Sequence, residues 1–137
     1  SVSARGRKTL EIFQRGYFFV GRQKIKGAAE YVQNIEKQKV ITLKSLVDYM
    51  PGQVVSKTLV QNDKVSVTVF SFDKGEEIST HAAGGDAMVT VLEGVGKFTV
   101  DGVEYHVREG ETLVMPKNIP HAVFGEERFK MLLTVSF

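Results

Sequence analysis

The stretch from Lys97 to Pro116 reads KFTVDGVEYHVREGETLVMP, and it decides the fold class. Asp101-Gly102 is a two-residue pair of the kind that closes a β-hairpin, because both residue types tolerate positive φ. Alternating apolar residues lead into this pair and away from it, as in strands with one buried face. Glu109-Gly110 is a second turn signal, and another apolar run follows it. The stretch therefore predicts three short antiparallel strands in succession.

The same pattern continues on both sides of this stretch. We expect strands at residues 53–61, 64–72, 87–92, 97–100, 103–107, 112–115, 122–124 and 128–137. Short strands at spacings of about ten residues, without a long amphipathic helix, are typical of an antiparallel sandwich or barrel. The run 64–72 carries apolar residues on both faces, which predicts a central strand buried on both sides. It also fits a sheet edge or face that a partner chain covers.

The residues before these strands predict only a little further structure. Residues 40–41 are candidates for a short strand. Leu43, Leu46 and Val47 recur at helical spacing, and Thr42 is placed to cap a short helical turn. The expected fold class is therefore all-β, a double-stranded antiparallel barrel with one or two short helical turns near its N-terminal side.

Composition sets outer limits on function. The chain has 137 residues, of which 42% are hydrophobic and 25% charged, which fits a single folded domain. It has no cysteine, so disulfides, thiolate metal ligands and a cysteine nucleophile are excluded, and a reducing, cytoplasmic location is expected. No apolar run approaches the roughly 18–20 residues that span a bilayer, so no membrane partner is expected.

Charge divides the chain into two regions, a leader at residues 1–31 and a barrel at residues 32–137. Residues 1–26 carry seven basic side chains against one acidic, whereas the remainder carries eleven basic against fifteen acidic. An acidic body argues against a nucleic-acid-binding face on the barrel. The leader has three interpretations: a basic arm for nucleic acid or a membrane surface, an extra strand at Tyr17–Val20, or an appended tail that is not native, since the first methionine is Met50.

Two blocks of the sequence resemble the motifs of the cupin superfamily. The first is Gly75-Glu-Glu-Ile-Ser-Thr-His81, followed by Leu92-Glu93-Gly94-Val-Gly96. It looks like a motif of a Gly, five residues, H-x-H, a later Glu and a turn Gly. The second, Gly110-Glu-Thr-Leu-Val-Met-Pro116-Lys-Asn-Ile-Pro120-His121, looks like G-x5-P-x-G-x2-H-x3-N. The chain is similar in particular to small, single-domain bacterial cupins of unassigned function, which implies a barrel that commonly pairs as a homodimer.

The resemblance also implies a set of ligand positions. Metal-binding cupins use the two histidines of H-x-H, the later Glu and the histidine of the second motif. Carried over residue by residue, His81 and His121 are kept, Ala83 stands at the second histidine, and Ala87 stands at the glutamate, or Met88 with one residue of slack. The resemblance therefore implies a ligand pocket at His81, Ala83, Ala87 and His121, from which two of four metal ligands are missing.

Asp86 offers one alternative for the metal. It lies one residue before the expected glutamate and follows the pliable Gly84-Gly85, so a local shift could complete a set of His81, His121 and Asp86 for Zn, Fe, Mn or Ni. Otherwise Asp86 faces solvent or caps its loop. The histidines could equally be pocket residues bonded to backbone or water. His106 is expected on the solvent side of its strand.

Three functions are compatible with this sequence. The first is a barrel that binds a small polar metabolite near His81 and His121 without robust catalysis. The second is a metal-dependent enzyme of the oxygenase, isomerase or lyase type that uses those histidines and Asp86. The third is a scaffold or interaction module. The missing ligands favour the first, and no G-x-S-x-G or P-loop string occurs.

Overall fold

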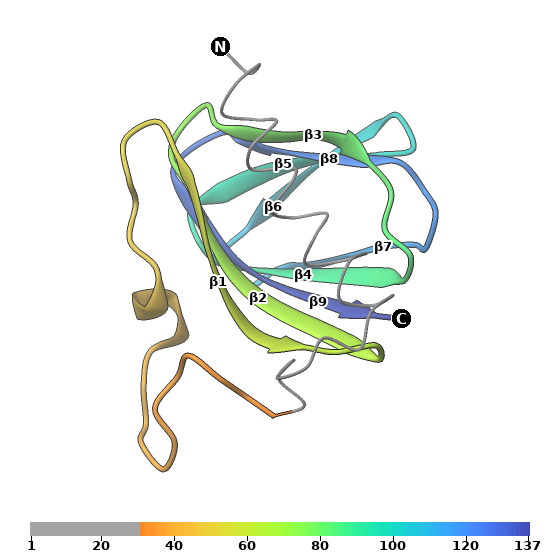
Figure 1. Ribbon diagram of the computed structural model, residues 1–137. Helices are drawn as coiled ribbons and strands as arrows, with labels where there is room; N and C mark the ends of the chain where they lie inside the picture. Colours follow the sequence, from red (N-terminus) through yellow and green to blue (C-terminus); the bar gives the residue numbers. More distant parts are fainter. Residues whose placement is uncertain (1–30) are drawn as a thin grey trace.

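Two antiparallel β-sheets face each other in the computed structural model, which describes residues 31–137 (Figure 1). The predictions for the basic leader, including the strand at Tyr17–Val20, lie outside the described residues. The elements are η2 (Leu43–Leu46), β1 (Val54–Gln61), β2 (Val65–Phe72), β3 (Glu77–His81), β4 (Asp86–Glu93), β5 (Val95–Val100), β6 (Val103–Arg108), β7 (Thr112–Met115), β8 (His121–Gly125) and β9 (Phe129–Ser136).

The strand order confirms the predicted double-stranded barrel. One sheet has the order β1-β2-β9-β4-β7, and the other has the order β3-β8-β5-β6. Neighbouring strands pair antiparallel throughout, and β2 pairs with β9 from Val65↔Ser136 to Phe72↔Phe129. Among residues 31–137, no helix is long or apolar enough to cross a membrane.

The turn between β5 and β6 confirms the hairpin prediction. Asp101 and Gly102 have φ of 50° and 79°, the positive pair that this two-residue turn requires. Gly94, between β4 and β5, is needed for a different reason. A Cβ at Gly94 would lie 2.0 Å from the carbonyl oxygen of Arg128, so a side chain there would force the strands apart.

The inner faces of the sheets form the main core. Phe72 and Phe129 are fully buried, and their stacked ring centroids lie 4.6 Å apart. Phe98 meets Phe129 edge-on, with 6.0 Å between the centroids. Burying each such side chain contributes about 1.5–3 kcal/mol, so this aromatic cluster holds the two sheets together.

The outer face of the five-stranded sheet is also covered, by an earlier part of the same chain. Val69 of β2 and Leu59 of β1 pack in one cluster with Val47, and Leu43 and Leu46 join its edge. This cover explains why both faces of β2 are apolar and confirms that the strand is buried on both sides. The alternative that this strand is a sheet edge covered by a partner chain is wrong, because β1 and β9 flank β2.

A polar group of four residues fastens this cover, and we call Tyr49, Glu93, Arg128 and Lys130 the outer cluster. The Tyr49 hydroxyl donates to Glu93 Oε2. Lys130 is buried; its Nζ donates to the carbonyl of Lys44 at 2.8 Å and lies 5.0 Å from the centroid of the Tyr49 ring. Arg128 Cζ lies 5.3 Å from the same centroid. The cluster therefore ties residues 44–49 to β4 and β9.

Three local predictions need correction. Residues 40–41 form no strand. The helical turn exists as a 3-10 turn, but the side chain of Thr42 does not cap it; the Thr42 carbonyl accepts from the backbone of Ser45 instead. β3 was not expected as a strand, because its sequence EISTH contains one apolar residue and so shows no alternation.

Candidate functional site

The structure brings the two motif histidines together. His81 ends β3 and His121 begins β8, and the two residues are cross-strand partners. Both are buried, and their ring centroids lie 4.4 Å apart at an interplanar angle of 71°. Residues forty positions apart thus form one imidazole pair on the inner side of the four-stranded sheet.

Backbone carbonyls fix the orientation of both rings. His81 Nδ1 donates to the carbonyl of Ser79 at 2.8 Å, and His121 Nδ1 donates to the carbonyl of Ile119 at 3.1 Å. A carbonyl can only accept, so the proton is on Nδ1 and the neutral ring has its lone pair on Nε2. Both Nε2 atoms are buried, and that of His121 has no hydrogen-bond partner among residues 31–137.

The surroundings keep the pair uncharged. Burial lowers the pKa of His81 to about 4; its hydrogen bond to Ser79 opposes the shift, and nearby His121 adds to it. Burial likewise lowers the pKa of His121, against the effect of its bond to Ile119. Two neutral imidazoles with inward acceptor atoms therefore form the centre at pH 7.

Ala83 and Ala87 occupy the other two positions of the expected pocket. Both are fully buried and belong to the main core. The backbone of Ala83 is fixed by a hydrogen bond, because its carbonyl accepts from the backbone N–H of Asn118 at 2.9 Å. Methyl groups stand where the resemblance would place a histidine and a carboxylate, so these positions contribute shape and no metal-binding atom.

Asp86 lies apart from the histidine pair. Its side chain is exposed, and Oδ1 accepts from the backbone N–H of Lys117 at 2.8 Å. Across the described part of the chain, no three His, Cys, Asp or Glu side chains gather in a way that could hold a metal ion. The described residues supply two imidazole ligands and do not fit a tight metal site.

His106 faces solvent, as expected from its place on the polar side of β6. Its Nδ1 donates to Glu126 Oε2 at 2.9 Å, and both side chains are more than two-fifths exposed. Exposed pairs of this kind contribute little to stability. His106 is therefore separate from the candidate site.

Sequence reasoning missed the residues that orient and adjoin the pair. Each Nδ1 bonds to the carbonyl two residues earlier, and a carbonyl leaves no signal in the sequence. A cross-strand row on the inner face runs from His81 through His121 and Val100 to Val103. The hairpin at residues 101–102 could have revealed the last step of this row, because the turn fixes that register.

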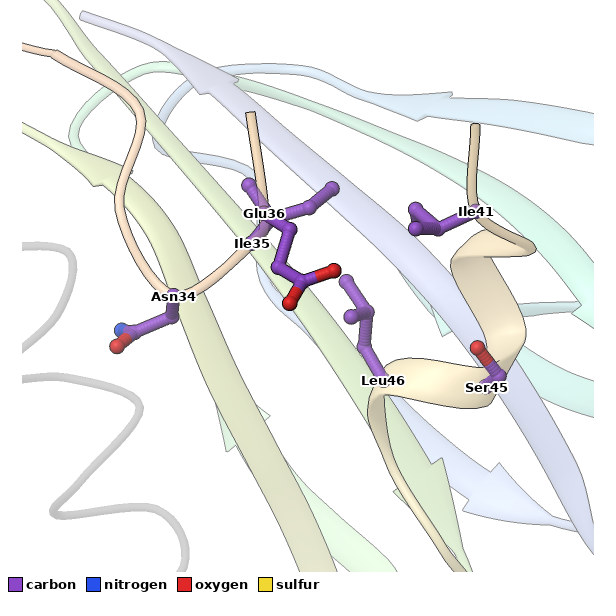
Figure 2. A pocket seen from close by; sticks show the side chains of 6 residues that line it. All are labelled: Asn34, Ile35, Glu36, Ile41, Ser45 and Leu46. Carbon is purple, nitrogen blue, oxygen red and sulfur yellow. The ribbon is translucent and has the colours of Figure 1, made fainter. Parts of the chain in front are cut away.

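A surface hollow of about 480 Å³ lies among the residues that precede β1, away from the histidine pair (Figure 2). Its lining residues are Asn34, Ile35, Glu36, Ile41, Ser45 and Leu46. Its polar groups already have partners: Glu36 pairs with Lys39 at 2.8 Å, and the Asn34 amide donates to the carbonyl of Thr58. Within the described part of the chain no titratable groups converge there, so the imidazole pair is the stronger candidate.

Comparison with known proteins agrees with this fold. The family model described as a cupin domain matches residues 68–135. A conserved protein of unknown function from Streptococcus pyogenes has 48% identity over 80% of this chain and 96% of its own, with a TM-score of 0.76. A cupin superfamily protein from Desulfitobacterium hafniense has 31% identity over 77% and 97%, with a TM-score of 0.74.

A conserved-barrel cupin protein from Leptotrichia buccalis has 49% identity over 71% of this chain and 47% of its own, with a TM-score of 0.70. No curated protein matches the chain. Fold, motif spacing and relatives agree, and the chain belongs to the cupin superfamily.

Proposed function

We propose that this protein is a binding barrel that takes a small polar molecule at the imidazole pair of His81 and His121. The observation that carries the proposal is the buried Nε2 of His121, an acceptor without a partner among the described residues. A buried polar atom left unpaired costs about 1–3 kcal/mol. A ligand that donates a hydrogen bond to this atom would recover that cost, which is a specific reason for binding here.

A metal assay combined with a ligand screen tests the proposal. Untagged protein is analysed for bound metal, and a thermal-shift screen of small polar metabolites is run with and without chelator. We expect little metal, and a ligand-dependent rise in melting temperature that persists in chelator, by mass action. His121→Leu should reduce that rise, whereas the surface control His106→Leu should preserve it. Ligand-dependent rises that survive both His81→Leu and His121→Leu would rule out the pair as the site.

A metal-dependent enzyme is the second candidate, and one observation favours it. Metal-binding imidazoles usually donate their other ring N–H to a carbonyl or carboxylate, and both rings do so here. Against it, residues 31–137 provide no third ligand beside the pair. Near-stoichiometric metal that disappears in His121→Leu would establish this candidate in place of the first. The absence of both metal and ligand binding would favour a scaffold.

A homodimer is expected from the family alone, and light scattering of the untagged full chain tests it. A cytoplasmic location is expected from the absence of cysteine, and cell fractionation tests that.

A further inference from the structure

The inner face of β6 changes from buried to exposed along one strand. Val107, Tyr105 and Val103 all point to the barrel interior, because they lie opposite Gly96, Phe98 and Val100 of β5. Val107 is 5% exposed, Tyr105 is 42% exposed and Val103 is 53% exposed. The five-stranded sheet therefore covers the end of β6 and leaves its beginning uncovered.

The uncovered end is the end that holds the histidines. Val103 pairs with Val100, and Val100 pairs with His121. Exposure falls along this row, from Val103 through Val100, which is 9% exposed, to the fully buried His121. A row of apolar residues thus leads from the exposed Val103 to the buried imidazole pair.

Hydrogen bonds between loops frame this end of the barrel. The Asn118 N–H donates to the carbonyl of Ala83, and the Asp101 N–H donates to the carbonyl of Pro120, both at 2.9 Å. Between them, Ile119 packs its side chain against the main core while its carbonyl orients His121. The frame is therefore preorganised, and a ligand would meet a fixed ring orientation.

We infer that the ligand is an uncharged amphipathic molecule, with a hydroxyl or amide N–H donor that reaches His121 Nε2 and an apolar body that lies on Val100, Val103 and Tyr105. This inference rests on the proposed function and adds the class of ligand and its direction of approach. The donor matches the lone pair on Nε2. The body matches the valines of the row and the ring of Tyr105.

Other ligand classes fit this surface less well. A carboxylate would place an acceptor oxygen against the acceptor Nε2, and neither Val100 nor Val103 offers a positive charge to compensate for its desolvation. A hydrocarbon would leave Nε2 of His121 unpaired and forgo the hydrogen bond. A neutral molecule with a hydrogen-bond donor and an apolar body fits both ends of the row. The donor bonds to His121 Nε2, and the body packs on Val103.

Three small probes separate these classes. Phenol has one donor on an apolar ring, toluene has the same size without a donor, and benzoate is an anion. Each is titrated into chelator-treated full-length protein at pH 7.5, and binding is followed by NMR shifts of the β6 and β8 amides. We expect phenol to bind about 3- to 10-fold more tightly than toluene, the ratio for one net hydrogen bond, and benzoate to bind most weakly.

Two pairs of variants localise the effect. Val103→Asp should weaken phenol and toluene alike, whereas Val114→Asp should not, although Val114 of β7 is equally exposed at 53%. His121→Leu should remove the preference for phenol over toluene and leave toluene binding in place. His106→Leu should keep the preference, because that ring lies on the surface.

Contrary results separate this inference from the proposed function. If benzoate binds best and His121→Leu abolishes its binding, the site stands and the ligand class is wrong. If His121→Leu changes the affinity of no probe, both proposals fail. Absence of saturable shifts with phenol and toluene, or equal effects of Val103→Asp and Val114→Asp, would overturn the apolar approach.

Discussion

The imidazole pair and the outer cluster are both polar groups packed against a sheet, and they differ in burial and in hydrogen bonding. Both histidines are buried, whereas only Lys130 of the outer cluster is buried and Arg128 is exposed. In the outer cluster the Tyr49 hydroxyl bonds to Glu93, and Lys130 Nζ bonds to a carbonyl. In the pair, both Nδ1 atoms are bonded, but His121 Nε2 has no partner within residues 31–137. The outer cluster is therefore bonded to residues of its own chain, whereas the imidazole pair contains a buried acceptor without a partner among the described residues.

Under the proposed function, this difference separates a structural role for the outer cluster from a binding role for the imidazole pair. A saturated polar cluster contributes to stability, so removal of a member leaves a partner unsatisfied. A buried acceptor without a partner costs stability, and under the proposed function a ligand donates the missing hydrogen bond. Substitutions in the outer cluster should therefore destabilise the fold, and substitutions in the pair should mainly weaken ligand binding.

Acid gives the largest expected effect. The pKa of His81 is lowered to about 4 in the folded chain from its ordinary 6.5. Between these two pH values the unfolded chain binds a proton that the folded chain does not. The free energy of unfolding therefore has its full value above about pH 6.5 and falls as pH decreases towards 4. The loss should reach about 3 kcal/mol, at about 1.36 kcal/mol for each pKa unit. Urea unfolding across this window measures it.

The same titration on His81→Leu provides the control. Without this imidazole the slope between pH 6.5 and 4 should flatten, and the lowered pKa of His121 leaves a smaller remainder. The carboxylates of Asp73 and Glu93 also have lowered pKa values, so their contribution is lost at still lower pH. An unchanged slope in His81→Leu would show that burial of this ring is not the cause.

Lys130→Met should have the next largest effect. The variant keeps the apolar stem but removes the buried ammonium that bonds to Lys44 and lies over Tyr49. A hydrogen bond from a charged donor contributes about 1.5–3 kcal/mol, so we expect a loss of about 2 kcal/mol by urea denaturation. Lys97→Met is the matched control: Lys97 Nζ also lies 5.0 Å from a ring centroid, but the side chain is partly exposed, so the loss should stay below about 0.5 kcal/mol.

Tyr49→Phe should cost less, about 1 kcal/mol, because the ring stays and only the bond to Glu93 is lost. That bond is the main cause of the lowered pKa of Glu93, so the pKa should also move back towards its ordinary range. Urea unfolding measures the first effect, and carboxyl NMR titration measures the second. Tyr105→Phe on the exposed start of β6 should change stability by less than about 0.5 kcal/mol. Equal losses in the two variants would remove the distinction between the regions.

Local sequence patterns predicted most of the barrel, because the alternation of apolar and polar residues along a strand shows which of its faces is buried. Asp101-Gly102 required positive φ at both positions, and the backbone has it. The cover over β2 was not predictable in the same way. Apolar residues on both faces show that both are buried, but the covering residues, such as Leu43 and Val47, come from a segment with weak regular structure.

The candidate site was predicted to the level of its residues but not of its geometry. The motif spacing indicated His81 and His121, and the structure places their rings 4.4 Å apart. It could not indicate the carbonyls that select the tautomer, because every residue has a carbonyl. Nor could it decide the position of Asp86, which depends on whether the loop before β4 turns its side chain inward or towards the backbone of Lys117.

His121→Leu should give the smallest change in stability and the clearest change in function. The substitution removes a buried acceptor that lacks a partner, which favours the fold, and it also removes the bond to the Ile119 carbonyl, which opposes it. Because the two effects are each about 1 kcal/mol and have opposite signs, the net change should stay within about 1 kcal/mol. Urea unfolding without ligand measures this, and titrations of phenol and toluene on the same sample should show that the preference for phenol is lost. If His121→Leu lowered the free energy of unfolding as much as Lys130→Met and left ligand binding unchanged, His121 would have a structural role. The barrel would then have no acceptor available for a ligand at this position.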